Sequence, residues 1–534
     1  MHVLRIDSEQ GVEVVLSWCF AFPQNCIEIG SHFSSNYLNC CSPIVMQPLS
    51  SLINIDKSAK QAVYIQIADQ LMKLIRNGTL QSGFRLLSSR QLADLLDVHR
   101  RTVVQAYDEL LAQGWLESKT GNGTFVADHF PLIEPLDKEG KTKEFKANKV
   151  AGFSFTTKPI LNRPVLKSTS GLHLDDGFPD VRLAPLADLS RAYRTQLLTG
   201  NSYYKLGYAD TQGSSWLRQE LSSYLNETRG LKTTADNILI VRGTIMGLNL
   251  VSMGLLKTGD HVVIGEMGWY GASTNFSYVG AKILSVPADE HGIDMDALEQ
   301  ICQKQSIRLV YVTSHHHYPT TVALRADRRL RLLSLSEKYG FIIFEDDYDY
   351  DFHYESKPLL PLAGSDKSGM VLYCGSFTKT ISPAFRVGYL VGPENVISHL
   401  AQLRRIVDRQ GDTMLENAFA ELLQSGVIQR HLRKSLRIYR HRRDLFAKLL
   451  ETELADYLQF QIPDGGMAVW TKFSPEIDMV SLSQNALKKD LYFSDGGYHQ
   501  SGNVTRLGFA SSNDDELERS VGILKKLLNR TTNI

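Results

Sequence analysis

A lysine that follows two hydroxyl-bearing residues is the first feature of this sequence with a clear chemical use. The run GSFTK contains Ser376, Thr378 and Lys379, and Arg386 follows shortly afterwards. A lysine amine can form a Schiff base with an aldehyde, while hydroxyls and a guanidinium can grip a phosphate group. These properties match pyridoxal phosphate. We therefore predict that Lys379 bonds the cofactor aldehyde and that Ser376, Thr378 and Arg386 hold its phosphate.

An acidic run lies upstream of this lysine. The apolar segment FIIF leads directly into EDDY, so the acidic groups are expected at the carboxyl end of a strand, where open parallel sheets bind ligands. A carboxylate beside the ring nitrogen keeps a pyridine ring protonated. Asp346 is the candidate for this role, and Tyr348 for a contact to the phenolic oxygen of the ring. A divalent-metal site is the alternative for EDDYDYD, but the lysine motif argues against it, and we predict no metal.

Residues elsewhere in the chain can complete this site. Gly243-Thr244-Ile245 follows the apolar run NILIV and opens a helical stretch, so its backbone N–H groups can bind phosphate at a helix N-terminus. Tyr270 can stack on the pyridine ring, and a core aromatic is an equally good interpretation. Arg506 can bind a ligand carboxylate through two parallel hydrogen bonds, the alternative being a surface salt bridge. The run His315-His316-His317 could suggest a metal site, but adjacent strand residues alternate faces and cannot all point at one ion. We therefore predict that these histidines lie in a loop or behind the residues that contact the ligand.

The elements that must position these side chains form an alternating pattern. Apolar runs at residues 237–241, 261–264, 309–313 and 341–344 alternate with helical stretches. Short apolar runs separated by helices are typical of parallel strands that helices bury on both faces. We therefore predict an α/β fold with a mostly parallel central sheet.

A different pattern precedes this region. Apolar residues from 64 to 75 fall mostly on one helical stripe that stops at Asn77-Gly78. Ser88-Ser89 can cap a second helix that runs to about Asp97, and a third helix runs from Arg100 to about Gln113. Residues 115–118 and 124–126 are predicted strands, because the Asn-Gly step between them is a strong hairpin signal. Three helices and a hairpin make a winged helix-turn-helix.

The third helix of this module begins with a basic cluster. In helix-turn-helix proteins the second of the paired helices lies in the major groove, and its first residues reach base edges. Here those residues are Arg100, Arg101 and Thr102. Arg90 and Lys119 add charge nearby, as contacts to phosphates and bases require. A solvated helix face is the alternative for two adjacent arginines alone, and the complete module argues against it.

Bulk composition limits the classes of function. The 534 residues are 43% hydrophobic and 22% charged, which is the balance of a folded globular protein. Basic and acidic side chains number 58 each, so no global field attracts nucleic acid or a membrane. No apolar run approaches the roughly 20 residues that span a bilayer, and the first residues do not resemble a signal peptide. We therefore expect a cytoplasmic protein with no membrane partner, and the six cysteines to be free thiols.

Changes of pattern along the chain predict four parts. Residues 1–50 lack periodicity and are predicted to be a disordered N-terminal extension, and residues 60–128 form the DNA-binding module. Residues 129–168 contain several prolines and a lysine-rich stretch, which is typical of an inter-domain linker. Residues 169–534 are predicted to form the cofactor-binding domain.

The DNA-binding module resembles a known family along its whole length. The run LLSSRQLADLLDVHRRTVVQAYDELLAQGWLESKTGNGTFV looks like the DNA-binding domain of the GntR family of bacterial transcription regulators. Leu87 stands where the family usually has proline, and His99 where a small polar residue is common. The resemblance implies a wing tip at Gly123 that enters the minor groove. It also implies contacts to promoter DNA from Arg90, Arg100, Arg101 and Thr102.

The remaining chain, roughly residues 170–530, resembles fold-type I aminotransferases. The motifs YADTQGSSWLRQEL, TSHHHYPTTVAL, FEDDYDYDFHY and GSFTKTISPAFRVGYL look like those of the MocR subfamily, in which a GntR module is fused to this fold. The resemblance implies a smaller C-terminal subdomain and a homodimer in which Tyr208 reaches the phosphate of the partner subunit. It implies binding of pyridoxal 5'-phosphate, catalysis by Lys379 and the roles already given to Asp346, Tyr348, Arg386, Tyr270 and Arg506.

This sequence departs from the subfamily pattern at three places. Thr321 stands where glycine is expected after Pro319-Thr320, and RGTIMGL lacks the glutamine and alanine common after the phosphate-binding turn. Ala209 and Thr211 interrupt the usual Gly-Asp-Pro. These changes are compatible with cofactor binding, but they weaken the expectation of efficient transamination.

Two functions fit the sequence. The first is a transcription regulator whose cofactor domain senses a small amine, an amino acid or the vitamin itself. The second is an active pyridoxal-phosphate-dependent aminotransferase with an accessory DNA-binding module. An intact DNA-binding module is unnecessary for catalysis, whereas a retained Lys379 is compatible with sensing, so we favour the regulator. Such a ligand changes DNA binding only if it binds two states of the protein unequally.

Overall fold

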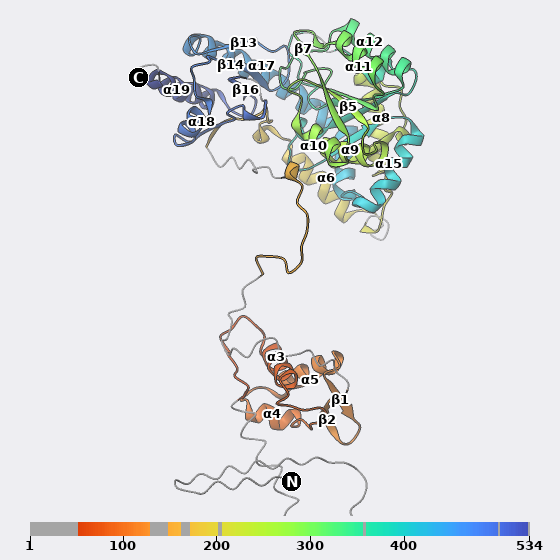
Figure 1. The fold of residues 1–534 in the computed structure, drawn as a ribbon, viewed down its shortest axis with the longest axis vertical. Helices are drawn as coiled ribbons and strands as arrows, with labels where there is room; N and C mark the ends of the chain where they lie inside the picture. The colour runs from red at the N-terminus through yellow and green to blue at the C-terminus, as the bar shows by residue number, and fades with distance from the viewer. Residues whose placement is uncertain are drawn as a thin grey trace, which may run out of the picture. The chain divides into compact units, whose positions relative to one another are not determined.

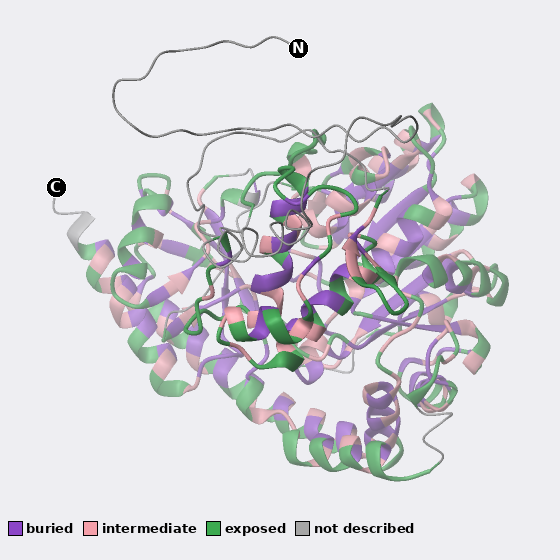
Figure 2. Ribbon diagram, turned by 90° about the horizontal axis from the view of Figure 1, so that it is seen from below, coloured by how far each residue is buried: buried purple, intermediate pink, exposed green. Residues whose placement is uncertain are grey.

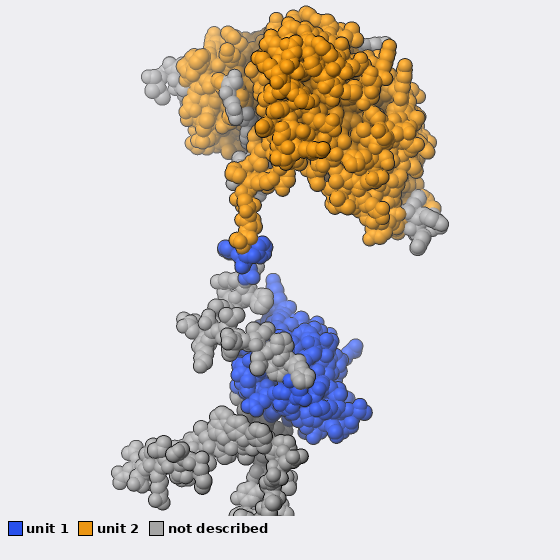
Figure 3. All heavy atoms as spheres, turned by 45° about the vertical axis from the view of Figure 1, so that its right-hand side comes forward, with its two compact units in different colours: residues 1–153 blue, residues 154–534 orange. Residues whose placement is uncertain are grey.

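The computed structural model describes residues 52–128, 148–161, 171–200, 206–355, 359–499 and 502–531. The predicted extension at 1–50 and much of the predicted linker lie outside the described residues. The chain divides into two compact units, residues 1–153 and residues 154–534, which Figure 3 colours blue and orange. Among the described residues, no helix combines the length and the apolar character that a membrane span requires.

The first unit is a three-helix module with a two-stranded wing. It consists of α3 (Val63–Arg76), α4 (Ser89–Leu95), α5 (Arg100–Ala112), β1 (Leu116–Lys119) and β2 (Gly123–Val126). The hydroxyl of Ser88 accepts a hydrogen bond from the backbone N–H of Gln91, and this capping box starts α4. Buried apolar residues of all three helices share one core, which Ile53 joins from before α3. The predicted winged helix-turn-helix is confirmed.

A seven-stranded sheet forms the centre of the second unit (Figure 1). In spatial order its strands are β4 (Ile238–Val241), β12 (Gly388–Val391), β11 (Val371–Ser376), β10 (Ile342–Asp347), β9 (Leu309–Val312), β5 (His261–Gly265) and β6 (Lys282–Val286). β12 runs antiparallel to both β4 and β11, and the other pairs of neighbouring strands are parallel. Most residues of these strands are buried (Figure 2), as expected for a parallel sheet covered on both faces.

Helices bury both faces of this sheet. Alternate strand residues such as Leu239, Tyr311 and Phe344 pack against α9 (Thr244–Leu255), α10 (Tyr270–Tyr278) and α15 (Glu394–Val407). Their neighbours, such as Ile240 and Ile343, face the other side. That side is covered by α6 (Leu186–Leu198), α8 (Ser215–Arg229), α11 (Met295–Lys304), α12 (Ala326–Tyr339) and α16 (Thr413–Gln424). The predicted α/β architecture with a mostly parallel sheet is therefore confirmed.

A smaller C-terminal part packs on a core of its own. Its elements are α17 (Val427–Glu453), β13 (Leu458–Phe460), β14 (Ala468–Phe473), α18 (Met479–Leu487), β15 (Leu491–Phe493), β16 (Val504–Gly508) and α19 (Asp514–Thr531). Short elements elsewhere are β3 (Leu172–Leu174), β7 (Ala288–Asp289), β8 (Gly292–Ile293), α13 (Leu362–Ser365) and α14 (Phe377–Thr380). Single 3-10 turns occur at Pro159–Leu161, Val181–Leu183, Ala235–Asn237 and Gly497–His499. Because β3 pairs with β15, residues from near the start of this unit join the C-terminal part.

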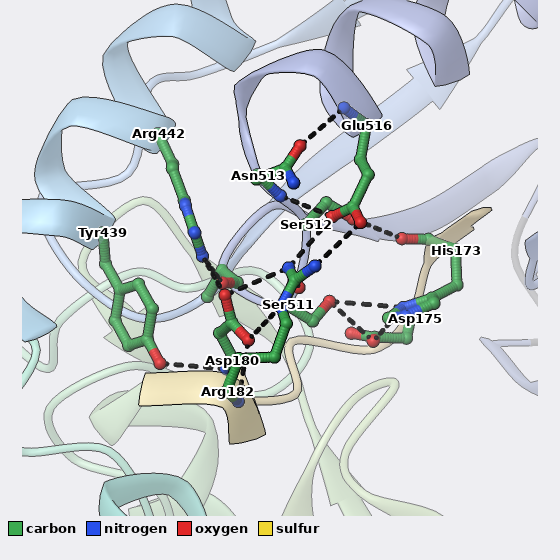
Figure 4. Close-up of polar contacts among 11 residues, drawn as sticks. His173, Asp175, Asp180, Arg182, Tyr439, Arg442, Ser511, Ser512, Asn513 and Glu516 are labelled. Atoms are coloured by element: carbon green, nitrogen blue, oxygen red, sulfur yellow. Dashed lines mark hydrogen bonds and ion pairs between the residues drawn. The ribbon is translucent and has the colours of Figure 1, made fainter. Parts of the chain in front are cut away.

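The segment after β3 is tied down by buried charges, which Figure 4 shows. Asp175 accepts hydrogen bonds from the Ser511 hydroxyl at 2.8 Å and from the backbone N–H of Phe178 at 2.7 Å. Asp180 pairs with Arg442 at 3.0 Å and with Arg182 at 2.7 Å. The segment is therefore anchored on both sides of Asp176 and Gly177.

Residues 154–161 were predicted from the sequence to be part of the linker, but they belong to the second unit. Lys158 donates a hydrogen bond from Nζ to the carbonyl oxygen of Tyr278 at 3.0 Å, and the same ammonium lies 4.1 Å from the centroid of the Tyr278 ring. This end of the predicted linker is thus attached to α10.

Candidate functional site

The residues predicted to bind the cofactor meet at the carboxyl edge of the central sheet. A cavity of about 290 Å³ lies there, where β4, β5, β9, β10 and β11 end and where the antiparallel β12 begins. Nine of the predicted residues line it: Thr244, Ile245, Asp346, Tyr348, Ser376, Thr378, Lys379, Arg386 and Arg506. They come from segments spread over nearly half of the chain, so the sheet topology assembles the site.

Lys379 lies in the short helix α14 and directs its amine into this cavity. Its Nζ donates a hydrogen bond to the carbonyl oxygen of Gly177 at 2.6 Å and lies 4.8 Å from the centroid of the Phe178 ring. Burial lowers the pKa of Lys379 below the ordinary value of a lysine. A lowered pKa increases the fraction of neutral amine, which is the form that attacks an aldehyde.

Asp346, near the end of β10, is buried and hydrogen-bonded on both oxygens. Tyr311 donates to Oδ2 at 2.7 Å, and Thr244 donates to Oδ1 at 3.4 Å. Burial raises the pKa of Asp346 to about 7. A protonated pyridine nitrogen beside this carboxylate would restore its charged form, because an adjacent positive charge stabilises the anion.

The predicted phosphate-binding residues surround one end of the cavity. Gly243 precedes α9, and Arg386 lies close enough that a Cβ on Gly243 would be 2.6 Å from the Arg386 Nη2 atom. Arg386 donates hydrogen bonds to the carbonyl oxygen of Arg242 and, weakly at 3.5 Å, to the Thr378 hydroxyl. Within the described residues no carboxylate forms an ion pair with Arg386. Its charge, the adjacent hydroxyls and the N-terminus of α9 therefore suit an anion.

The two predicted aromatic residues differ in position. Tyr348 lines the cavity and donates from its hydroxyl to the carbonyl oxygen of His316 at 3.0 Å. Tyr270, at the start of α10, lines an adjoining cavity of about 490 Å³, whereas its neighbour Trp269 lines both cavities. The structure therefore brings the indole of Trp269 into the site in addition to the predicted residues.

Arg506 is 3% exposed and already has a carboxylate partner. Its Nε lies 2.6 Å from Oδ1 of Asp176, and its Nη1 donates to the carbonyl oxygen of Pro319 at 2.8 Å. The predicted alternative for Arg506 was a surface salt bridge, but this pair lines the cavity. The Arg506 guanidinium therefore lines the cavity as predicted, but it is paired with Asp176, a carboxylate of the same chain.

Tyr208 does not line the cavity of its own chain. Its side chain is 81% exposed, and the guanidinium carbon of Arg409 lies 4.0 Å from its ring centroid. An exposed aromatic ring of this kind is compatible with a contact to another subunit.

The other carboxylates of EDDYDYD have partners within the protein. Glu345 accepts a hydrogen bond from the Ser314 hydroxyl at 2.5 Å, and Asp347 accepts one from the Tyr373 hydroxyl at 2.5 Å. Asp349 pairs with His316 at 2.7 Å. Among the described residues, no group of three or more histidine, cysteine or acidic side chains has the arrangement of a metal site. The histidines at 315–317 are buried beside the cofactor cavity.

Thr321 adopts a conformation that explains why glycine is expected at this position. Its φ is +65°, in the left-handed region that β-branched residues rarely enter. The Thr321 N–H donates to the carbonyl oxygen of His317 at 2.6 Å, so the turn keeps its shape with a threonine. The departure thus introduces local strain next to Tyr318 and Pro319 without removing the turn.

The predicted DNA-contact residues lie on the surface of the first unit. Arg90, Arg100, Arg101 and Gly123 are exposed, and Thr102 is half-buried. His99 explains its own departure from the family pattern, because its Nδ1 accepts a hydrogen bond from the Arg101 N–H at 3.2 Å and caps α5. Leu87 packs against the core of the unit. The basic start of α5 is thus exposed on the surface of the first unit.

Comparisons with known proteins agree with this arrangement. Residues 63–126 match the family of bacterial regulatory proteins of the gntR type, and residues 190–524 match aminotransferase class I and II. The chain is 30% identical over 469 residues to YdfD of Bacillus subtilis, an uncharacterized HTH-type transcriptional regulator, covering 87% of this chain and 96% of YdfD. It is 28% identical to MocR of Rhizobium meliloti, a probable rhizopine catabolism regulatory protein, covering 83% and 88%.

The chain belongs to the MocR-type transcription regulators of the GntR family. Its second unit is also similar to a solved aminotransferase, LysN of Thermus thermophilus, with 26% identity and a TM-score of 0.63. That likeness covers 68% of this chain and 93% of LysN. The regulator therefore combines a DNA-binding module with a fold-type I aminotransferase-like domain.

Six residues that line the cavity of the regulator escaped the sequence prediction: Asp176, Phe178, Trp269, Tyr311, Thr313 and Tyr318. Tyr311 lies within an apolar strand and has the sequence pattern of a core residue. Asp176 and Phe178 both stand in the run LDDGFPD, far along the chain from the other residues that line the cavity. Only the acidic pair Asp175-Asp176 directly before Gly177 was available to suggest Asp176.

Proposed function

We propose that this regulator holds pyridoxal 5'-phosphate on Lys379 and changes its binding to promoter DNA when a small amine, an amino acid or the vitamin itself enters the site. The observation that carries the proposal is the single cavity shared by Lys379, Asp346 and Arg386, in a chain that retains a complete DNA-binding module. LysN, the solved relative, is complexed with N-(5'-phosphopyridoxyl)-L-leucine.

The residues present fit this cofactor. Arg386 has no carboxylate partner among the described residues, and Gly243 leaves room that a side chain would fill, so the phosphate group finds a cation and space together. Asp346 is a buried carboxylate that a protonated ring nitrogen would stabilise. Bound pyridoxal phosphate supplies an electrophilic carbon that primary amines attack. Lys379 would bind that carbon until an incoming primary amine displaces it, and the released Lys379 amine would then be free to take up the proton that the incoming amine loses.

A ligand in the cofactor domain can change DNA binding only if the protein has two conformations that bind the ligand with different affinity. We propose that the regulator acts as a homodimer, in which the exposed Tyr208 of each chain contacts the phosphate site of the other. Two DNA-binding modules would then meet two half-sites, and DNA affinity would depend on their separation. A ligand that favours one arrangement of the dimer would thereby change DNA affinity.

The direct test uses the full chain loaded with pyridoxal phosphate and a DNA fragment selected by the protein from its own genome. We expect a ligand from a panel of amines and amino acids to change the DNA dissociation constant by at least about fivefold, the lower range of allosteric coupling. Fluorescence anisotropy measures this constant. A panel without effect, together with an equal affinity of cofactor-loaded and cofactor-free protein, would refute sensing.

A working aminotransferase is the second candidate, because Lys379, Asp346 and Arg506 occupy the same cavity. Steady transamination at about 1–1,000 turnovers per second, the ordinary range of enzymes, would favour it. The strained Thr321 and the internal partner of Arg506 favour the regulator instead.

The phosphate-binding turn provides a further prediction. We expect Gly243→Ala to weaken pyridoxal phosphate binding by about tenfold or more, because the new Cβ meets Arg386 and because φ at this position is +74°. Gly340→Ala is the matched control, since Gly340 also has φ of +74° and has nothing within 4 Å of the added carbon. Absorbance titration of the cofactor-free protein measures the affinity. Equal affinities of the two variants would contradict the assignment of this turn.

A further inference from the structure

The guanidinium of Arg506 is paired with the carboxylate of Asp176, and this pair bears on which ligands the site can bind. The sequence predicts that Arg506 binds a ligand carboxylate through two parallel hydrogen bonds. In the structure Arg506 is buried, and its Nε lies 2.6 Å from Oδ1 of Asp176. The Tyr318 hydroxyl donates a hydrogen bond to Oδ2 of the same carboxylate at 3.0 Å. Asp176 therefore has two partners on the cavity wall, one charged and one neutral.

The backbone around Asp176 resists displacement. On one side Asp175 is bonded to Ser511 and His173, and on the other Asp180 is bonded to Arg182 and Arg442 (Figure 4). Asp175 and Asp180 are each 4% exposed. Pulling the segment away from Arg506 would break buried charged hydrogen bonds, which are among the strongest in proteins. The carboxylate of Asp176 is thus a built-in part of the site.

A ligand carboxylate on Arg506 would lie beside Asp176. Two carboxylates that share one guanidinium repel each other, and the cost is larger in a buried site than in water. Without Asp176, the same guanidinium would be an uncompensated buried charge that attracts an anion. Arg506 alone would favour ligands that carry a carboxylate. With Asp176 beside it, the site favours ligands that lack one.

We infer that Asp176 replaces the ligand carboxylate on Arg506, so that the ligand of this site is a primary amine without a carboxylate on its amine-bearing carbon. This inference rests on the proposed function and narrows its range of ligands. The adjoining cavity of about 490 Å³ shares Asp176, Trp269 and Arg506 with the cofactor cavity and offers room for the rest of the amine. Asp176 is 42% exposed along its side chain, so its carboxylate can also accept a hydrogen bond from a distal ammonium.

Matched ligand pairs test this inference. Ethylamine and L-alanine differ only by a carboxylate, as do 1,4-diaminobutane and L-ornithine. We expect each amine to bind the cofactor-loaded full chain about tenfold or more tightly than its amino acid, after correction for the same pair with free pyridoxal phosphate. The change in the visible spectrum on titration gives the affinities, and isothermal calorimetry checks them independently. Tighter binding of the amino acid in both pairs would overturn the inference.

Variants of Asp176 test whether this residue causes the preference for amines over amino acids. In Asp176→Asn, which keeps the size of the side chain, we expect the preference to reverse toward the amino acids. Asp176→Ala serves as the second variant if the first is unstable. Asp327→Asn is the matched control, since Asp327 is an exposed carboxylate paired with Arg325 on α12. An unchanged preference in both Asp176 variants would overturn the role of Asp176.

The outcomes separate this inference from the proposed function. Protein that gains no colour from pyridoxal phosphate contradicts the proposed function itself. Coloured protein that prefers amino acids leaves the proposed function in place and refutes only the narrower ligand class.

Discussion

Replacing Lys379 with alanine is expected to abolish the covalent bond between the regulator and pyridoxal phosphate completely. Lys379 is the lysine that lines the cavity beside Asp346 and Arg386. Pyridoxal phosphate added to Lys379→Ala should keep the absorbance of the free aldehyde, whereas the wild-type protein should show the yellow absorbance of the lysine-bound cofactor. The variant should retain weak binding, because the proposed phosphate-binding groups, Arg386, Thr378 and the N-terminus of α9, are unchanged in it.

Two measurements make this test decisive. Borohydride reduction followed by mass spectrometry should find the cofactor on the peptide that contains Lys379 in the wild-type protein and on no peptide of the variant. Lys338→Ala is the control, because Lys338 is an exposed lysine that pairs with Glu299 on the surface. If Lys379→Ala turned as yellow as the control, the lysine assignment would be wrong.

The second large effect concerns DNA. Changing both Arg100 and Arg101 to alanine is expected to weaken specific DNA binding by at least about a hundredfold, since a bidentate contact to a base is worth about 1–3 kcal/mol. Both arginines are exposed at the start of α5, and alanine favours helix, so the fold of the module should persist. Gel retardation with specific and unrelated DNA, at one fixed salt concentration, separates the two kinds of binding.

A charge-matched control excludes a purely electrostatic explanation. Lys73→Ala with Arg76→Ala removes two exposed positive charges from the end of α3 of the same module. This double variant should lose about the same affinity for specific DNA as for unrelated DNA. The loss of affinity for specific DNA should be smaller than in the Arg100 and Arg101 variant. Specific binding that survives in the Arg100 and Arg101 variant would show that another surface recognises the bases.

Local patterns in the sequence were sufficient for much of the fold. The apolar runs predicted as strands at 261–264 and 309–313 correspond to β5 and β9, and the capping serine at Ser88 marks the start of α4. These predictions succeeded because burial of a short apolar run and satisfaction of a helix end are local requirements. The strand predicted to end at Phe344 continues to Asp347, since tertiary hydrogen bonds satisfy Glu345 and Asp347 inside the protein.

Side-chain roles that depend on distant partners could not be predicted in this way. Tyr311 alternates with apolar neighbours in β9, and only the pairing of β9 with β10 brings its hydroxyl to Asp346. Trp269 and Tyr270 are adjacent, and their different positions follow from the direction in which α10 begins. His99 caps α5 with its ring, a use that its residue type alone does not indicate.

Contiguous motifs in the sequence were enough to predict the two-part organisation and the chemistry of the proposed cofactor residues, because the residue types within each motif carry the chemistry. Lys379, Asp346 and Arg386 were identified on this basis, and the tertiary structure brings them to one cavity. The partner of the Arg506 guanidinium, in contrast, follows from the tertiary packing alone. Asp176 lies more than three hundred residues away along the chain, and it reaches the guanidinium because β3 pairs with β15 of the C-terminal part. A contact of that kind follows from packing and buried charge pairing, which no local pattern encodes.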